Sequence, residues 1–155
     1  MGSIIKERMK LAKFKGVEHE ALLSLLVASS ALRAKQEKIA AQNKITPTQF
    51  FVLRILKEAH PNGLARYEIL SRLIDAQPDV TRIIDRLVEA KLAERITTEE
   101  DKRQSLARLT KKGLKLVTDM EGQMDEFDNL LKGKISKKDS QVLTAICEKI
   151  LDSLD

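Results

Sequence analysis

The sequence predicts a mainly α-helical fold with one small β-hairpin, arranged as a winged helix-turn-helix that is flanked by long helices. Apolar residues recur at helical spacing over most of the 155 residues. Two short segments with this spacing, 66–74 and 78–90, are separated by about three residues, as in a helix-turn-helix. Two runs long enough for short strands follow, 92–96 and 105–109, with the polar segment 97–104 between them. A hairpin that directly follows a helix-turn-helix is a wing.

The first half of the chain carries two further helical patterns with recognisable ends. The pattern over 18–43 ends at Asn43, a residue type that tolerates the left-handed conformation found after helices. The next helix begins at Thr46, Pro47 and Gln49, because threonine can cap it, proline suits its first position and glutamine completes a capping box. This helix runs to about residue 59 and is too apolar for a surface helix. We therefore expect it at the centre of the core.

Capping residues also define two helices in the last third of the chain. Thr110 begins a helix that extends to about residue 131, and Ser136 with Asp139 forms a capping box before the last helix. Both helices carry an apolar stripe at helical spacing.

The length suits a single domain over residues 1–155. The winged helix-turn-helix occupies about residues 46–110. The flanking regions, about 4–43 and 112–155, carry long apolar stripes that find little partner surface inside so small a winged region. Because exposed stripes of this size are unusual for a monomer, we expect these regions to form a homodimer.

Motifs and composition argue against several classes of protein. The sequence has no Gly-rich phosphate loop and no G-x-S-x-G, H-E-x-x-H or C-x-x-C pattern, so nothing favours an enzyme or a cofactor. One cysteine and two histidines, Cys147, His19 and His60, are too few for a disulfide framework or for a metal site built from these residues. The 28 Lys and Arg against 23 Asp and Glu give a net charge of +5, which permits an anionic partner.

The longest nearly apolar run does not suit a membrane protein. It covers residues 21–32 and is shorter than the roughly 18 residues that a membrane span requires. The first 16 residues are basic and lack the apolar stretch of a secretory signal. We therefore expect no membrane association and a cytoplasmic location.

Four short segments occur in an ordered set from the second helix of the helix-turn-helix onward. They read Val-Thr-Arg-Ile-Ile-Asp-Arg-Leu at 80–87, Leu-Ala-Glu-Arg at 92–95, Asp-Lys-Arg at 101–103 and Leu-Thr-Lys-Lys-Gly at 109–113. On this set, which ends in D-x-R and L-T-x-x-G, the chain resembles the MarR family of bacterial winged-helix transcriptional regulators. The resemblance covers about residues 18–113 and extends more loosely to the C-terminus.

The resemblance implies a homodimer whose terminal helices intertwine. Each subunit would place a recognition helix in the major groove and a wing against the minor groove of a near-palindromic operator in double-stranded DNA. We therefore expect a DNA-binding transcriptional regulator, a repressor that a small molecule releases, and not an enzyme.

The beginning of the recognition helix carries Gln77, Asp79, Thr81 and Arg82, and Arg86 lies further along the same helix. These are the candidate DNA-binding residues of the helix. Short or planar polar groups at this end reach base edges. Gln77 suits an adenine edge, Arg82 suits a guanine edge or a phosphate, and Thr81 suits a phosphate or a thymine methyl group.

The two arginines of this helix also have a structural interpretation. They would then form ion pairs on the helix surface with Asp79, Asp85 or Glu89. The resemblance favours DNA contact for Arg82 and leaves both interpretations open for Arg86.

The wing tip carries Asp101, Lys102 and Arg103. A guanidinium on a hairpin tip suits the narrow and strongly negative minor groove of A·T-rich DNA. The resemblance implies that Asp101 holds Arg103 in place through an ion pair, and Lys102 suits a phosphate. The alternative is a solvated loop, because Glu99 and Glu100 add negative charge beside Asp101 and would repel phosphate.

Three residues depart from the family pattern. Ala65 and Ala76 replace the hydroxyl residues that often begin the two helices of the helix-turn-helix, so two potential phosphate contacts are missing. Lys91 replaces the glycine that usually ends the recognition helix, which makes the turn after this helix less favourable.

The family resemblance also implies a ligand or redox signal, read between the dimerisation helices and the winged region. The first long helix lacks the early cysteine used for hydroperoxide sensing, and Cys147 has only Lys149 as a nearby cation. For a small anionic aromatic ligand, the first residues to consider are His19, Arg33 and Arg54. Each also suits a surface or interhelical ion pair, so we assign no ligand site.

Two other classes of function are compatible with the fold. A winged-helix module that binds protein and not DNA would not need Thr81, Arg82 and Arg103 on one face. A small helical enzyme would need a deep pocket with coupled titratable groups.

Overall fold

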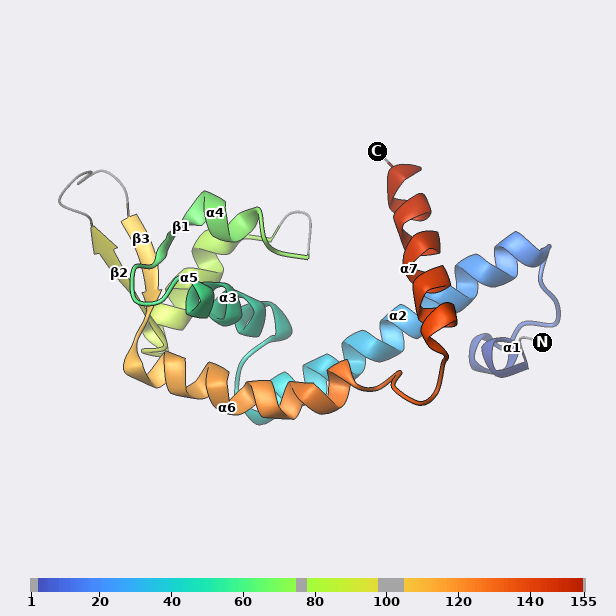
Figure 1. The fold of residues 1–155 in the computed structure, drawn as a ribbon, viewed down its shortest axis with the longest axis horizontal. Helices are drawn as coiled ribbons and strands as arrows, with labels where there is room; N and C mark the ends of the chain where they lie inside the picture. Colours follow the sequence, from blue (N-terminus) through green and yellow to red (C-terminus); the bar gives the residue numbers. More distant parts are fainter. Residues whose placement is uncertain (1–2, 75–77, 98–104, 155) are drawn as a thin grey trace. The chain divides into compact units, whose positions relative to one another are not determined.

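A computed structural model of the chain describes residues 3–74, 78–97 and 105–154. The chain divides into two compact units, Met1–Glu121 and Gly122–Asp155. The elements, labelled in Figure 1, are α1 (Ser3–Met9), α2 (Val17–Gln42), α3 (Pro47–Glu58), β1 (Leu64–Ala65), α4 (Arg66–Leu70), α5 (Val80–Glu89), β2 (Ala93–Thr97), β3 (Ser105–Leu109), α6 (Lys111–Asp128) and α7 (Lys137–Asp152).

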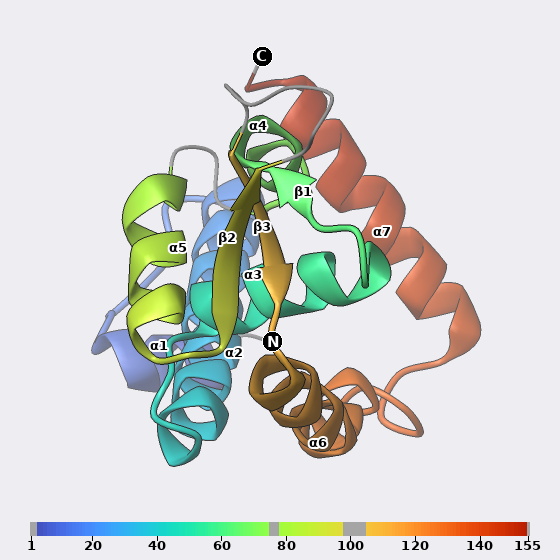
Figure 2. The same cartoon turned by 90° about the vertical axis from the view of Figure 1, so that its left-hand side faces the viewer.

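The first unit contains the predicted winged helix-turn-helix. Helices α4 and α5 form the helix-turn-helix, and β2 and β3 pair in antiparallel register from Ala93↔Leu109 to Thr97↔Ser105. Figure 2 shows α5 beside β2 and α3 behind the sheet, in agreement with the contacts between these elements. The predicted fold class, mainly α with a small hairpin, is confirmed.

Helix α3 forms the centre of the core, as its apolar sequence predicts. It buries Phe50, Val52, Leu53, Ile55 and Leu56. Helix α5 and the sheet add Val80, Ile84, Leu87, Ala107 and Leu109. Complete burial of a large apolar side chain contributes roughly 1.5–3 kcal/mol, so α3 supplies a large share of the hydrophobic stabilisation.

The predicted capping box at the beginning of α3 is confirmed. The Thr46 hydroxyl accepts a hydrogen bond from the Gln49 amide at 3.2 Å, and the Gln49 side chain accepts one from the Thr46 amide at 2.8 Å. Two backbone donors at the helix end, which have no partner inside the helix, are therefore satisfied.

A third strand, β1, joins the hairpin and was not predicted from the sequence. It pairs with β3 through Leu64↔Ala107 and Ala65↔Leu106, giving the strand order β1-β3-β2. Gly63, which precedes it, has a φ of +82°, and a Cβ atom there would lie 2.6 Å from the Ala107 carbonyl oxygen. A strand of two residues shows no alternation of apolar and polar residues, so periodicity could not reveal it.

The end of α2 corrects one prediction. Asn43 is not left-handed, because its φ is −99°, and the left-handed residue is Lys44 with a φ of +58°. The amides of Lys44 and Ile45 donate to the carbonyls of Ala41 at 3.0 Å and Ala40 at 3.2 Å. This pair of hydrogen bonds is a Schellman motif, which requires a left-handed backbone conformation one residue after the C-cap.

Two helices end earlier than predicted because their last turns tighten. After α4, the amides of Arg72 and Leu73 donate to carbonyls three residues earlier, both at 3.2 Å. After α6, the amide of Leu130 likewise donates to the Phe127 carbonyl at 3.0 Å. Bonds of this type replace the α-helical pattern, so the helices end at Leu70 and Asp128 instead of near residues 74 and 131.

The second unit contains α7, whose predicted capping box is confirmed. The Asp139 amide donates to the Ser136 hydroxyl oxygen at 3.1 Å, and the Asp139 carboxylate accepts bonds from the Ser136 hydroxyl at 2.6 Å and amide at 3.2 Å. These bonds favour the charged form and lower the pKa of Asp139. No residue of α7 is buried, and its apolar side chains Val142, Leu143 and Ile146 are exposed.

The first turn of α6 explains the glycine of the L-T-x-x-G segment. A Cβ atom on Gly113 would collide with the carbonyl oxygen of Leu92 and would lie 2.8 Å from its carbonyl carbon. Helix α6 therefore packs directly against the backbone that follows α5, and only glycine permits this distance.

We predict that Gly113→Ala lowers the free energy of unfolding by about 1–3 kcal/mol, because the backbone of Leu92 cannot move aside easily. The matched control is Gly122→Ala in the same helix, where an added Cβ would have no neighbour within 4 Å. The control should raise stability by about 0.5–1 kcal/mol through the higher helix propensity of alanine. Urea unfolding at one fixed protein concentration measures both, and equal effects would contradict the close packing of α6.

Candidate nucleic-acid interface

Helix α5 has one buried side and one exposed polar side. Val80, Ile84 and Leu87 face the core. The polar residues Thr81, Arg82, Asp85 and Arg86 are exposed, as the sequence predicts. The buried side fixes the rotation of the helix about its axis, so the polar side is presented to solvent in a defined orientation.

Asp79 caps this helix. Its carboxylate oxygen Oδ1 accepts a hydrogen bond from the Arg82 amide at 3.1 Å. The helix therefore begins at Val80 and not at residue 78, which corrects the predicted beginning. One oxygen of the candidate DNA-binding residue Asp79 thus has a structural role.

Among the residues that the structure describes, the two exposed arginines of α5 form none of the ion pairs that their surroundings allow. Within the described residues, neither Arg82 nor Arg86 has an acidic partner. Asp85 instead pairs with Arg95 of β2, with Arg95 Nη2 at 2.7 Å from Asp85 Oδ1. The structural interpretation of Arg82 and Arg86 as members of surface ion pairs therefore finds no contact in the described chain.

The Asp85–Arg95 pair was missed in the sequence because it depends on tertiary structure. It joins the exposed side of α5 to the strand that leads into the wing. A second pair, Arg108 Nε to Glu94 Oε1 at 2.8 Å, crosses from β3 to β2. Both pairs are partly exposed, so each contributes little to stability and mainly fixes geometry.

Four predicted DNA-binding residues lie outside the described residues, namely Gln77 before α5 and Asp101, Lys102 and Arg103 between β2 and β3. The described strands lead into the second of these segments, since the β2–β3 pairing extends to Thr97↔Ser105.

The departures from the family pattern have different consequences. Ala65 lacks a capping hydroxyl, but its amide donates to Glu68 Oε2 at 2.8 Å, so the beginning of α4 keeps one stabilising bond. Ala76 lies outside the described residues. Lys91 has a φ of +60°, the left-handed conformation that glycine adopts most readily, so the unfavourable turn after the recognition helix is present.

The first turn of α4 adds two residues that the sequence analysis did not select. Arg66 and Tyr67 are exposed there, and Tyr67 has 64% of its surface accessible. Both side chains can donate hydrogen bonds to phosphate. Helical spacing places Tyr67 on the side opposite the buried Ile69, whereas Arg66 lies three residues before Ile69 and is exposed at the beginning of the helix.

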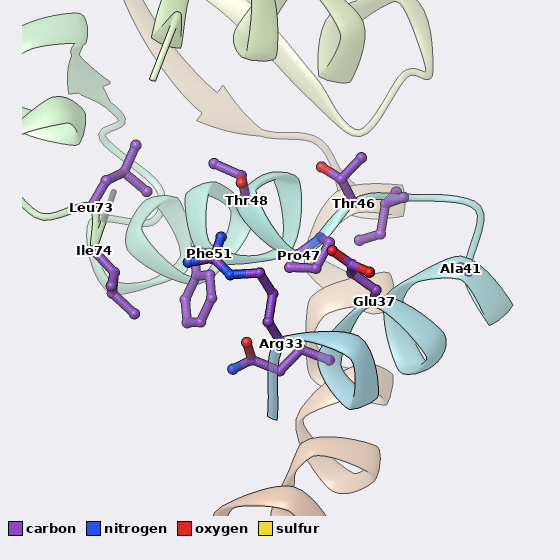
Figure 3. Close-up of a pocket in the computed structure, with 11 residues that line it drawn as sticks. Arg33, Glu37, Ala41, Thr46, Pro47, Thr48, Phe51, Leu73 and Ile74 are labelled. Carbon is purple, nitrogen blue, oxygen red and sulfur yellow. The ribbon is translucent and has the colours of Figure 1, made fainter. Parts of the chain in front are cut away.

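A hollow of about 440 Å³ lies between α2, α3 and the residues after α4 (Figure 3). Its wall includes Arg33 and Glu37 of α2, Phe51 of α3, and Leu73 and Ile74. Charges of both signs line it, so it has no strong preference for anions.

The three residues considered for an anionic ligand do not come together in this hollow. Of the three, Arg33 lines it. The Arg54 guanidinium lies 6.0 Å from the centre of the Phe50 ring. His19 accepts a hydrogen bond from the Lys15 amide at 3.3 Å, near the beginning of α2.

Two further features concern the described part of the chain. No group of three His, Cys, Asp or Glu residues there is placed to hold a metal ion. None of the helices described is long and apolar enough to cross a membrane.

Comparison with known proteins identifies the family. Residues 45–105 match the sequence model of the MarR family. The chain is 30% identical over 105 residues to the HTH-type transcriptional regulator FarR of Neisseria gonorrhoeae, an alignment that covers 67% of this chain and 70% of that protein. The chain belongs to the MarR family. The predicted resemblance is confirmed, and the family is one of winged-helix transcription regulators.

Solved structures agree with this assignment. The MepR–DNA complex of S. aureus superposes with a TM-score of 0.74 at 26% identity, covering 83% of this chain and 94% of that one. A MarR-like regulator from Bacillus cereus gives a TM-score of 0.72 at 20% identity, covering 90% of this chain and all of that one, which supports the fold alone.

Proposed function

We propose that this MarR-family regulator is a repressor that binds a near-palindromic operator in double-stranded DNA as a homodimer. The observation that carries the proposal is the exposed side of α5, where Arg82 and Arg86 have no acidic partner among the described residues. The similarity to MepR, whose structure was solved as a complex with DNA, supports DNA binding by this chain.

In this proposal the first turn of α5 reads bases in the major groove. Arg82 contacts a guanine edge or a phosphate, and Thr81 contacts a phosphate or a thymine methyl group. Gln77 contacts an adenine edge, and Arg86 contacts the DNA backbone. Asp79 acts mainly through its cap, which fixes the backbone that carries Arg82.

The wing carries the second contact. Arg103 enters the minor groove, Asp101 holds its guanidinium, and Lys102 contacts a phosphate. The support is the sequence pattern, together with the β2–β3 pairing and the Asp85–Arg95 pair, which tie the described base of the wing to α5.

The homodimer is supported by the apolar side chains left exposed on the flanking helices. Leu22 and Leu26 of α2 are 53% and 55% accessible, and Val142 and Ile146 of α7 are 49% and 48% accessible. A second copy of the chain would bury such surface and bring two recognition helices together on one operator.

Release by a small molecule completes the proposal. The hollow bounded by α2, α3 and residues 73–74 is the region where a ligand could act, because residue 74 lies four residues before Pro78 and the recognition helix.

A regulator of transcription acts where DNA is, so we place the protein in the cytoplasm. The direct test is titration of the DNA that flanks its own gene at two salt concentrations, where a salt-insensitive or absent interaction would contradict the proposal.

We expect a dimer of roughly twice 17.5 kDa in sedimentation at micromolar concentration. Ile146→Glu should shift the protein toward the monomer, because it places a charge in the apolar side of α7. Ile74→Glu is the matched control, since this isoleucine is 77% accessible and lies in the winged region. A wild-type monomer that still binds operator tightly would defeat the dimer proposal.

For base reading, we expect Arg82→Ala to weaken binding by about 1–3 kcal/mol, chiefly on the cognate operator. Competition titrations with cognate and scrambled duplexes measure the difference. Asp79→Asn keeps an oxygen acceptor for the cap and should retain more affinity than Asp79→Ala. An equal loss on both duplexes would assign Arg82 to phosphate contact.

For the wing, we expect Arg103→Ala to weaken binding to many sequences together and to lower the salt slope by about one unit. Asp101→Ala should resemble a weaker form of the same change, because the arginine loses its support. A clear gain in affinity for Asp101→Ala would show that the acid merely repels phosphate, and the wing mechanism would then be wrong.

A further inference from the structure

The end of the recognition helix is held by the beginning of α6. The Ala90 carbonyl accepts a hydrogen bond from Lys112 Nζ at 2.9 Å. The next two carbonyls accept from Thr110, with its hydroxyl 2.7 Å from Lys91 O and its amide 3.1 Å from Leu92 O. Three consecutive carbonyls of the turn between α5 and β2 therefore bond to two residues of one neighbouring segment.

This turn needs such support. Lys91 adopts a φ of +60°, which is unfavourable for a residue with a Cβ atom. The last carbonyls of a helix also lack partners within the helix, and a cation is favourable beside them. The Lys112 ammonium supplies both a hydrogen-bond partner and a cation, because it donates to the carbonyl at the C-terminal end of α5 and carries a positive charge.

The packing around these bonds leaves little freedom. Gly113 approaches Leu92 so closely that an added Cβ would collide with the Leu92 carbonyl oxygen. Leu87, Leu92 and Leu109 are buried. The first turn of α6 therefore lies directly against the turn that follows α5.

We propose that Lys112 is a positioning residue for DNA binding. Its hydrogen bond to the Ala90 carbonyl holds the recognition helix in the orientation that binds DNA. The inference rests on the proposed function. Ala90 lies eight residues beyond Arg82, about 12 Å along the helix axis from the reading end, so the bond to Lys112 is at the opposite end of α5.

The matched control is Lys111. It is exposed in the same turn of α6 and makes no hydrogen bond or ion pair with the described residues. Lys111→Met and Lys112→Met change the net charge equally. Any difference between them therefore reports the bond to Ala90 and not the loss of a charge.

The first experiment measures amide hydrogen exchange in the free protein. The amides of Ala90, Lys91 and Leu92 bond to carbonyls of α5 at 3.0, 2.9 and 2.8 Å. In Lys112→Met these three amides should exchange about fivefold faster, while those of α3 stay unchanged, because the lost bond lies at the end of α5. Unchanged exchange at all three would overturn the inference.

The second experiment measures operator affinity at two salt concentrations. Lys112→Met should weaken binding about fivefold with an unchanged salt slope, and Lys111→Met should weaken it less than about twofold. Lys112→Arg should retain binding, since it keeps a cationic donor. Adding Lys91→Gly to Lys112→Met should restore most of the affinity, because glycine adopts the turn without support.

Several outcomes would overturn the inference. Equal effects of Lys111→Met and Lys112→Met would assign the loss to charge alone. A salt slope lower by about one unit in Lys112→Met would assign it to direct phosphate contact. If neither Lys112→Arg nor Lys91→Gly restored operator affinity, Lys112 would not act through the turn between α5 and β2. Absence of operator binding by the unchanged protein would refute the proposed function itself. Faster amide exchange in Lys112→Met would then show that the bond from Lys112 to Ala90 stabilises the fold only.

Discussion

The burial of α3 is the constraint on which the winged unit depends. Phe50, Leu53 and Leu56 are almost completely inaccessible, and α2, α4, α5 and β3 all contact this helix. The apolar side of α5 has its place because the core fixes its rotation, and the polar side faces outward as a consequence. The orientation of the candidate DNA-binding surface is thus decided by buried residues of the core.

The features that sequence could predict are those with local causes. The caps at Thr46 and Ser136 depend on residues three positions apart, and both are present as expected. The apolar pattern of α5 likewise separates its buried and exposed sides. Each of these signals lies within a few residues of the feature that it determines.

The features that sequence missed depend on partners far along the chain. The pairing of Leu64 with Ala107 and the ion pair of Asp85 with Arg95 join residues that only the tertiary structure brings together. The prediction for the end of α2 was wrong for another reason. Asparagine adopts the left-handed conformation more often than most residues, but the Schellman bonds place this conformation at Lys44. The contribution of the wing tip stays a prediction, because Asp101 and Arg103 lie outside the described residues.

The strand order gives the sheet a protective property. Strand β3 is central, so β1 and β2 are the edges of the described sheet, where unpaired backbone groups can recruit a strand from another molecule. Strand β1 is only two residues long, and β2 carries the charged residues Glu94 and Arg95. A short edge and a charged edge both discourage intermolecular strand pairing. The charges on β2 that fix the base of the wing therefore also help to keep the protein from aggregating through its sheet.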